Sequence, residues 1–256
     1  MRVGVVQTRL QKKPEDAFDY GLALLEEALE KDCGFVCFPE MWLTGFNCNE
    51  SRIATAEAYL ERVRELSSSS DCIIVAGTFP ERAEEGVYNT AYVFFKGSLY
   101  KRRKRYLFGL MNEPELFLSG EPPEVMELNG VKFGIIICYE LRFPELSKLL
   151  ALRGADILFV PAQWPDARVE HWRVLLRARA VENQFFVAGV NVVGKGTALS
   201  FSGFSALYHP LGNPVIEVSK THGLFVADID FGDAVSYRKS IPVLEDSVKY
   251  GFVKGF

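Results

Sequence analysis

The chain of 256 residues is 48% hydrophobic and 24% charged, which is enough apolar material for one sizeable core. Its net charge of -4 and pI of about 5.6 offer no global positive field to nucleic acid or to an anionic membrane. The longest apolar runs, such as residues 133–139, are far shorter than the roughly 20 residues that cross a bilayer. The composition therefore predicts a soluble globular protein that binds neither nucleic acid nor membrane.

The cysteine content favours a reducing compartment. The number of cysteines is odd, at five, and the N-terminal MRVGVVQT has no pattern of a cleavable signal, so we expect free thiols in the cytoplasm. Cys33 and Cys37 could suggest a metal pair, but the three histidines, His171, His209 and His222, lie far from them in sequence. We therefore expect no metal, and two small residues packed around a buried strand.

The first half of the chain alternates strand and helix signals. Pro14 suits the first turn of a helix, and apolar residues recur after it at helical spacing. A second apolar stripe of the same period follows a short strand signal. The expected strands lie at residues 3–7, 35–38, 72–78 and 88–95, and the two helical stripes are Phe18, Leu22, Leu25, Leu29 and Ile53, Ala56, Leu60, Val63.

The same alternation recurs after a loop-rich stretch at residues 101–123. Pro144 opens a helix, and a second helix is expected at 169–183. One further strand is expected near 224–229, after the second half has ended. The expected strands of the second half lie at residues 131–138, 157–160, 185–192 and 201–208.

Each half therefore has the pattern β-α-β-α-β-β. Helices between strands imply right-handed crossovers, mostly parallel pairing and sheets covered by helices. Two such halves can bury their remaining sheet faces against each other. The sequence predicts an α/β protein with a four-layer α-β-β-α sandwich, and no composition shift marks a linker between two domains.

Cys138 ends the apolar run GIIIC, and Pro144 opens a helix six residues later. Ligands of α/β proteins bind outside the carboxyl ends of strands, so a cysteine at this point would face a crevice. A nearby helix N-terminus or cation would lower the pKa of the thiol and make a thiolate available. Taken alone, the segment is better explained by an inert cysteine in the core.

Two other segments place a charged group at a similar point. Glu40 follows the apolar run FVCFP, and apolar surroundings would raise its pKa toward the range of a general base. Lys104 lies in KRRKRYLFG, where Leu107 and Phe108 favour a lysine that reaches a developing oxyanion. A surface glutamate and a solvated basic face are the ordinary alternatives for these segments taken singly.

In this order and at these spacings the segments resemble the nitrilase superfamily of carbon–nitrogen hydrolases, whose members use a Glu–Lys–Cys triad. Two positions depart from the family pattern, since Tyr106 stands where His is usual and Glu140 stands for the usual Asp. The resemblance covers essentially the whole chain and implies one hydrolase domain over residues 1–256. The matching stretches are Phe38-Pro39-Glu40, Thr44-Gly45-Phe46, Lys104 to Phe108, Cys138 to Pro144 and His171 to Gln184.

The resemblance implies a role for each member of the triad. Cys138 would be the nucleophile, Glu40 the general base and Lys104 an electrostatic stabiliser, joined by the backbone N–H of Tyr139 at the oxyanion. The thiolate would attack an amide carbonyl, ammonia would leave, and water would hydrolyse the thioester. No metal or organic cofactor is required.

The family often carries a second glutamate after the lysine, which helps to position the substrate or the attacking water. Glu113 occupies that place in this sequence, and Glu115 is a rival two residues further on. We expect Glu113 to be the fourth catalytic residue.

The motif around Cys138, together with AQWPDARVEHWRVLLRARAVENQ, most resembles ω-amidases. These enzymes hydrolyse the side-chain amide of α-keto acids such as 2-oxoglutaramate and 2-oxosuccinamate. Trp164 follows a predicted strand and could form a pocket wall or simply be a core aromatic. The carboxylate of such a substrate needs a cation, for which Arg142 and Arg173 are the candidates, although Arg142 could instead pair with a neighbouring acid.

Other functions remain open at this level. Within the family, the alternatives are an N-carbamoyl amide hydrolase, an amidase of deaminated glutathione and, less favoured, a true nitrilase. A redox-responsive binding protein would oxidise Cys138 instead of acylating it. An α/β serine hydrolase lacks support, since the nearest match to Gly-x-Ser-x-Gly, at residues 203–207, fails at its last position. The resemblance further implies a small-molecule amide substrate and a homodimer or larger homo-oligomer.

Overall fold

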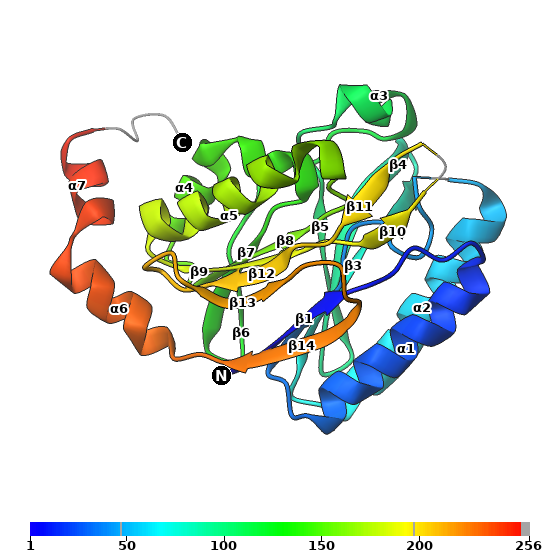
Figure 1. The fold of residues 1–256 in the computed structure, drawn as a ribbon, viewed down its shortest axis with the longest axis horizontal. Coiled ribbons are helices and arrows are strands. Elements are labelled where there is room, and N and C mark those ends of the chain that lie inside the picture. Colours follow the sequence, from blue (N-terminus) through cyan, green and yellow to red (C-terminus); the bar gives the residue numbers. More distant parts are fainter. Residues whose placement is uncertain (47, 197, 252–256) are drawn as a thin grey trace.

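The first half of the chain forms the expected βαβαββ unit in the computed structural model, which describes residues 1–46, 48–196 and 198–251 (Figure 1). A further strand occupies the start of the stretch predicted to be a loop, because its SLYKRR sequence is an edge strand with mostly solvated side chains. The elements are β1 (Arg2–Gln7), α1 (Pro14–Glu30), β2 (Phe35–Cys37), α2 (Glu50–Ser68), β3 (Ile73–Ala83), β4 (Gly86–Phe95) and β5 (Ser98–Arg103).

The second half repeats the pattern with more short strands. Its elements are β6 (Met126–Leu128), β7 (Val131–Ile135), α4 (Pro144–Leu152), β8 (Ile157–Pro161), α5 (Val169–Asn183), β9 (Phe186–Val190), β10 (Val193–Lys195), β11 (Ser200–Ser202), β12 (Ser205–Tyr208), β13 (Pro214–Val218) and β14 (Gly223–Asp228). Short helices stand before and after this half: α3 (Glu113–Leu116), α6 (Phe231–Ser240) and α7 (Val243–Lys249). The last five residues of the predicted 1–256 domain lie outside the described residues.

Two predicted strands are corrected by the structure. The strand expected at 201–208 is divided, because Gly203 and Phe204 have positive φ angles of 76° and 54° and turn the chain between β11 and β12. The strand expected at 131–138 ends at Ile135, and Cys138 lies instead in a 3₁₀ turn at Cys138–Arg142. The nucleophile candidate is therefore on a turn beyond the strand and not on the strand itself.

The two halves build two sheets of the same design. Their strand orders are β14-β1-β2-β3-β4-β5 and β13-β12-β9-β8-β7-β6. In each sheet, three parallel strands are followed by two antiparallel ones, and one extra antiparallel strand closes the other edge. The late strand β14 therefore completes the first sheet, beside β1.

The sheets pack face to face and helices cover their outer faces, which confirms the predicted four-layer sandwich (Figure 1). Across the inner faces, Phe35 of the first sheet contacts Phe133 and Phe159 of the second, with ring centroids 5.4 and 5.1 Å apart. Helices α1 and α2 pack on the first sheet, and α4 and α5 on the second. None of the helices within the described ranges is long and apolar enough to cross a membrane.

This arrangement brings several strand ends to one edge. Strand β5 is antiparallel to β4, which is antiparallel to β3, so β5 runs in the direction of β2 and β3. Four residues singled out in the sequence follow the carboxyl ends of these strands: Glu40 after β2, Lys104 after β5, Cys138 after β7 and Trp164 after β8.

Candidate active site

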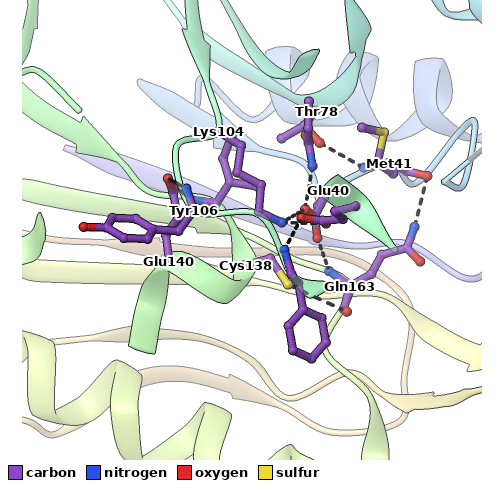
Figure 2. A network of polar contacts seen from close by, with 12 residues as sticks. Glu40, Met41, Thr78, Lys104, Tyr106, Cys138, Glu140 and Gln163 are labelled. Carbon is purple, nitrogen blue, oxygen red and sulfur yellow. Dashed lines mark hydrogen bonds and ion pairs between the residues drawn. The ribbon is translucent and has the colours of Figure 1, made fainter. Parts of the chain in front are cut away.

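Glu40 lies three residues after β2, and its backbone bridges to Thr78 of β3. The side chain is fully buried. Its Oε1 accepts hydrogen bonds from Asn89 Nδ2 and Lys104 Nζ, both at 2.8 Å, and its Oε2 accepts one from the backbone N–H of Gln163 at 3.1 Å. The carboxylate is thus held by three different segments of the chain, and its orientation is set by the fold (Figure 2).

Lys104 follows β5 directly and is also fully buried. Its Nζ donates to Glu40 at 2.8 Å and to Glu113 at 2.7 Å, so the ammonium lies between two carboxylates. Burial lowers the pKa of Lys104, but Glu40, Glu113 and the side chain of Cys138 outweigh it, and the net pKa is raised above its ordinary value. Lys104 is therefore a permanent cation at this point.

Glu113 opens α3 and is buried, while Glu115 two residues later is exposed. Besides Lys104 Nζ at Oε1, it accepts the backbone N–H of Phe108 at Oε2, at 2.8 Å. Burial and the neighbouring Glu40 raise its pKa against the opposing effect of Lys104. Of the two glutamates that the sequence offered for the fourth position, the structure brings Glu113 and not Glu115 to the cluster.

Cys138 stands at a sharp turn, with a positive φ of 47° that is unusual for a residue with a Cβ. Such backbone costs about 1–2 kcal/mol and persists only where the surroundings enforce it. The side chain is 7% exposed, and its Sγ lies 3.8 Å from the carbonyl oxygen of Gln163. The turn therefore holds the thiol at the junction of the two sheets instead of letting it follow the strand into the core (Figure 2).

The expected lowering of the thiol pKa is wrong for this structure. Burial raises the pKa of Cys138 well above its ordinary value, and the carboxylates of Glu40 and Glu113 raise it further, while Lys104 only partly opposes them. The resting residue is a neutral thiol. A base is consequently needed to remove its proton when it reacts.

A narrow pocket opens beside the thiol. Its walls include Cys138, Phe108, Trp164, Arg142 and Arg168, and it contains about 250 Å³ of empty space, its open mouth included. Buried Trp164 is fixed by Asn191, whose Oδ1 accepts the backbone N–H of Trp164 at 2.8 Å. The interior that a water-sized molecule can occupy is only about 10 Å³, so the walls close tightly around the thiol in this structure.

Two guanidinium groups lie at this pocket. The Arg142 guanidinium is 4.6 Å from the ring centroid of Trp164, and that of Arg168 is 5.6 Å from the ring of Phe108. Among the described residues neither arginine has a carboxylate partner. Burial, followed by the charge of Arg168, lowers the pKa of Arg142 from its ordinary value. Two uncompensated cations at a pocket wall form an anion-binding environment.

Arg173, the other arginine considered for substrate binding, is placed elsewhere. Its guanidinium donates to Glu170 at 3.1 Å and to Glu217 at 2.9 Å, and it is not part of the pocket wall. Arg168, and not Arg173, is therefore the second candidate beside Arg142 for binding a substrate carboxylate. The sequence could have indicated Arg168 by its place in WPDAR, four residues after Trp164. The short turn at Asp166–Arg168 brings it back beside Trp164, whose Nε1 donates to the Arg168 carbonyl.

The sequence alone also missed the polar residues that hold the cluster. Asn89 of β4 and Gln163 after β8 both bind Glu40, but each stands in an apolar strand sequence without a distinctive motif. Cys33 and Cys37 do not form a metal pair, since Cys33 packs on the outer face of the first sheet and Cys37 on its inner face. Within the described residues, no three His, Cys, Asp or Glu side chains gather as metal ligands.

Comparison with known proteins places this site in a family. The sequence model of the carbon–nitrogen hydrolases matches residues 2–239. The chain belongs to the carbon–nitrogen hydrolase family. It is accordingly a hydrolase that acts on carbon–nitrogen bonds other than peptide bonds.

Individual relatives match most of the hydrolase. The 2-oxoglutaramate amidase of Bacillus subtilis (strain 168) is 36% identical over 225 residues, 86% of this chain and 87% of that protein. A hydrolase in the agr operon of Staphylococcus lugdunensis is 36% identical over 228 residues, 86% of this chain and 97% of that protein. A solved CN-hydrolase superfamily protein from Xanthomonas campestris, with an arsenic adduct in its active site, is 29% identical with a TM-score of 0.85 over 96% of each chain.

Proposed function

We propose that this hydrolase releases ammonia from the side-chain amide of a small α-keto acid, of the 2-oxoglutaramate or 2-oxosuccinamate type. Cys138 is the nucleophile, Glu40 the general base and Lys104 the electrostatic stabiliser. The observation that carries the substrate class is the pair Arg142 and Arg168 at a narrow pocket that also contains Cys138. The similarity to a 2-oxoglutaramate amidase supports the same assignment.

Acylation begins with the neutral thiol. The Glu40 carboxylate takes the Cys138 proton while Sγ forms a bond to the amide carbonyl carbon, and the carbonyl electrons move onto oxygen. Two N–H bonds of Lys104 are directed at carboxylates, which leaves the third for the oxyanion, together with the backbone N–H of Tyr139. As the carbonyl re-forms, the C–N bond breaks and Glu40 returns its proton to nitrogen, so that ammonia leaves and a thioester remains.

Deacylation uses the same groups in reverse order. Glu40 takes a proton from water, whose oxygen attacks the thioester carbon and forms a second oxyanion at Lys104. The C–S bond then breaks, the carboxylic acid product leaves, and Glu40 gives the proton back to Cys138. Glu113 keeps the ammonium of Lys104 oriented throughout, through the 2.7 Å contact between Oε1 and Nζ.

The two arginines account for the rest of the substrate. Their guanidinium groups present planar N–H donors that match a carboxylate, and aromatic rings support both of them. Trp164 and Arg142 line the same pocket as the thiol, so the length of the substrate decides whether its amide reaches Cys138 while its carboxylate contacts the arginines. A substrate with a carboxylate at one end and an amide at the other fits this arrangement.

The proposal extends to the working state of the protein. We expect one catalytic domain over residues 1–256, a cytoplasmic location that suits its free cysteines, and a homodimer or larger homo-oligomer. Exposed apolar side chains on α5 and α7, among them Val174 and Val248 at 63% and 62% exposure, support association with a second copy. Light scattering of the purified chain tests this expectation, and a monomer at micromolar concentration would contradict it.

A substrate panel tests the proposed activity. Ammonia release is measured from 2-oxoglutaramate, 2-oxosuccinamate, an N-carbamoyl amino acid, a simple aliphatic amide and a nitrile, with Cys138→Ala as the background. We expect the two keto-amides to give the highest kcat/KM. Preference for the N-carbamoyl compound or the nitrile would overturn the substrate assignment, and release from none of the five would overturn the proposed class of substrate.

A further inference from the structure

Glu140 is a buried carboxylate that no step of the proposed reaction uses. It is fully buried, two residues after Cys138. Its Oε1 accepts the backbone N–H of Arg105 at 2.7 Å, that of Tyr106 at 3.2 Å and Arg102 Nη2 at 2.8 Å. Its Oε2 accepts the backbone N–H of Ile137 at 2.6 Å. Every donor on this carboxylate is thus within two residues of Lys104 or directly precedes Cys138 (Figure 2).

These contacts join the two sheets at the catalytic cluster. Arg102 lies in β5 of the first sheet, and Ile137 follows β7 in the second. Arg105 comes directly after Lys104, and Ile137 comes directly before Cys138. The Glu140 carboxylate therefore binds the backbone next to Lys104 and the backbone next to Cys138 at the same time. Its hydrogen bonds to these two segments fix how far apart the Lys104 ammonium and the Cys138 thiol lie.

The charge of Glu140 is compensated on the spot. Arg102 is 6% exposed, and its Nη1 lies 2.5 Å from Oε2 of Glu140. A buried carboxylate is stable only when it is paired and hydrogen-bonded, and loss of one partner leaves the other charge uncompensated. The pair of Arg102 and Glu140 therefore forms one unit.

The two departures from the family pattern are in direct contact here. Tyr106 donates its backbone N–H to Glu140, and its ring stacks on Phe143 with centroids 4.1 Å apart. Phe108 and Tyr139 form a second ring contact between the same two segments, at 4.6 Å. A glutamate reaches about 1.5 Å further than an aspartate, and that extra length lets one side chain bridge both segments.

We infer that Glu140, with Arg102, is a positioning residue that aligns Lys104 with the Cys138 turn across the two sheets. This inference rests on the proposed catalytic roles of Lys104 and Cys138 but not on the identity of the substrate. It explains how the positive φ of Cys138 is maintained, since Glu140 holds the N–H immediately before it. It acts through the two catalytic residues and does not touch the reacting atoms.

The test compares Glu140→Gln with a matched variant of another buried carboxylate, Glu81 of β3, which also pairs with cations of β5. Glu81→Gln removes another carboxylate that is 8% exposed and paired with β5, but Glu81 binds Lys101 and Arg103 and has no contact with Lys104 or Cys138. For each protein, Tm, kcat and KM are measured with the best amide of the panel. The pH dependence of Cys138 alkylation by iodoacetamide, followed by peptide mass, gives a readout that requires no substrate.

We expect Glu140→Gln to lower kcat about 100-fold with KM changed no more than about threefold, because misalignment acts on the transition state. Glu140→Asp keeps a negative charge for Arg102, but the shorter side chain cannot reach all of the donors. Its kcat should therefore lie between those of wild type and Glu140→Gln. In Glu140→Gln, the midpoint of Cys138 alkylation should move to higher pH, because Lys104, which opposes the raised pKa of the thiol, is no longer held in line with it. Glu81→Gln should match wild type in kcat and in alkylation, whatever its Tm.

Equal kcat and equal alkylation profiles in Glu140→Gln and Glu81→Gln would overturn the inference. Should Glu140→Gln fail to fold, Glu140→Asp decides the question with the same readouts, and unchanged kcat in that variant is the contrary result. If wild type turns over none of the amides, the proposed function fails while the alkylation profile still tests the alignment.

Discussion

Gln163 holds Glu40 from the opposite sheet, with its backbone N–H 3.1 Å from Glu40 Oε2. The carbonyl oxygen of the same residue lies 3.8 Å from the Cys138 thiol, and its side-chain amide donates to the carbonyl of Met41 at 3.0 Å. Oε1 of Glu40 already has two donors, so the remaining acceptor position on the carboxylate is at Oε2. The base and the nucleophile are therefore positioned by one residue, on the side of the carboxylate that can still accept a proton.

The arginines at the pocket should determine affinity for the substrate carboxylate. Arg142→Ala and Arg168→Ala each remove a charged hydrogen bond worth about 1.5–3 kcal/mol, so KM for the keto-amides should rise about 10- to 100-fold. The kcat should change little, because the carboxylate is bound equally before and during the reaction. Initial-rate kinetics on a keto-amide and on a simple aliphatic amide measure the effect.

Arg173→Ala is the matched control for that experiment, since Arg173 is held by Glu170 and Glu217 outside the pocket. It should leave KM for the keto-amides within about twofold of wild type. Two results would show that Arg142 and Arg168 do not bind the substrate carboxylate. One is an equal rise in KM for the aliphatic amide in Arg142→Ala and Arg168→Ala, and the other is a rise in KM for the keto-amides in Arg173→Ala.

Glu40→Gln should separate the supply of thiolate from catalysis. The Glu40 carboxylate is one of the groups that raise the pKa of Cys138, so the Cys138 thiol should titrate at lower pH in Glu40→Gln than in wild type. Turnover should nevertheless fall about 100- to 10,000-fold, because no group remains to take the proton and return it to ammonia. Cys138 alkylation against pH and ammonia release are measured on the same preparations. A variant that reacts as fast as wild type with an amide would show that Glu40 is not the base.

Gly77 lies where a side chain would press on the catalytic loop. Its φ is +94°, and a Cβ there would lie 2.3 Å from the carbonyl oxygen of Pro39, the residue before Glu40. Gly45 also has a positive φ, of +60°, but a Cβ there would meet nothing within 4 Å. Gly45→Ala should therefore cost about 1 kcal/mol, and Gly77→Ala about 3 kcal/mol or more together with reduced kcat. Urea unfolding at pH 7 gives both values, and equal costs would contradict the close approach to Pro39.

Glu81 should contribute to stability in a pH-dependent way. Burial raises the pKa of Glu81, but hydrogen bonds from Arg103, Thr90 and Lys101 outweigh it and lower the pKa from 4.5 to about 2. Because the folded pKa is the lower one, the contribution is complete above about pH 4.5 and is lost as the pH falls toward 2. Lys101 and Arg103 are partly exposed, so we expect a contribution of only about 1–2 kcal/mol.

The measurement for Glu81 is the free energy of unfolding of wild type and Glu81→Gln at pH 6 and pH 2.5. The difference between the two proteins should shrink by about 1–2 kcal/mol at the lower pH. A difference that is independent of pH would mean that Glu81 is not ionised through its pairing with β5. This result also qualifies Glu81→Gln as the control for Glu140→Gln.

Much of the fold could be predicted because its central strands are apolar runs between clear helical stripes. Several strands escaped prediction because they are short, as β6 and β10 are, or solvated on one side. Among the latter, β13 at Pro214–Val218 and β5 at Ser98–Arg103 are sheet edges whose polar residues resemble a loop. The division of the strand expected at 201–208 depends on the backbone angles of Gly203 and Phe204. An apolar sequence pattern carries no information about such angles.

Within the site, residues in distinctive motifs could be found and residues that act by position could not. Glu40, Lys104 and Cys138 follow apolar or basic runs, and the structure brings their side chains together. Asn89 contacts Glu40 only because β4 lies beside β3 in the folded sheet. Arg168 lines the pocket from the short turn at Asp166–Arg168, whereas Arg173 lies in α5 and binds Glu217. The sequence shows two arginines close together but not which of them the fold turns toward the pocket.

The most direct test of the central claim is to follow the acyl group on Cys138 during turnover of the best amide in the panel. Wild type is quenched in acid, and the Cys138 peptide is weighed; Cys138→Ala is assayed for ammonia in parallel. We predict that the peptide gains the mass of the substrate minus ammonia and that Cys138→Ala loses at least about 10,000-fold in ammonia release. Ammonia release by Cys138→Ala at a rate near that of wild type would contradict the assignment of Cys138 as the nucleophile.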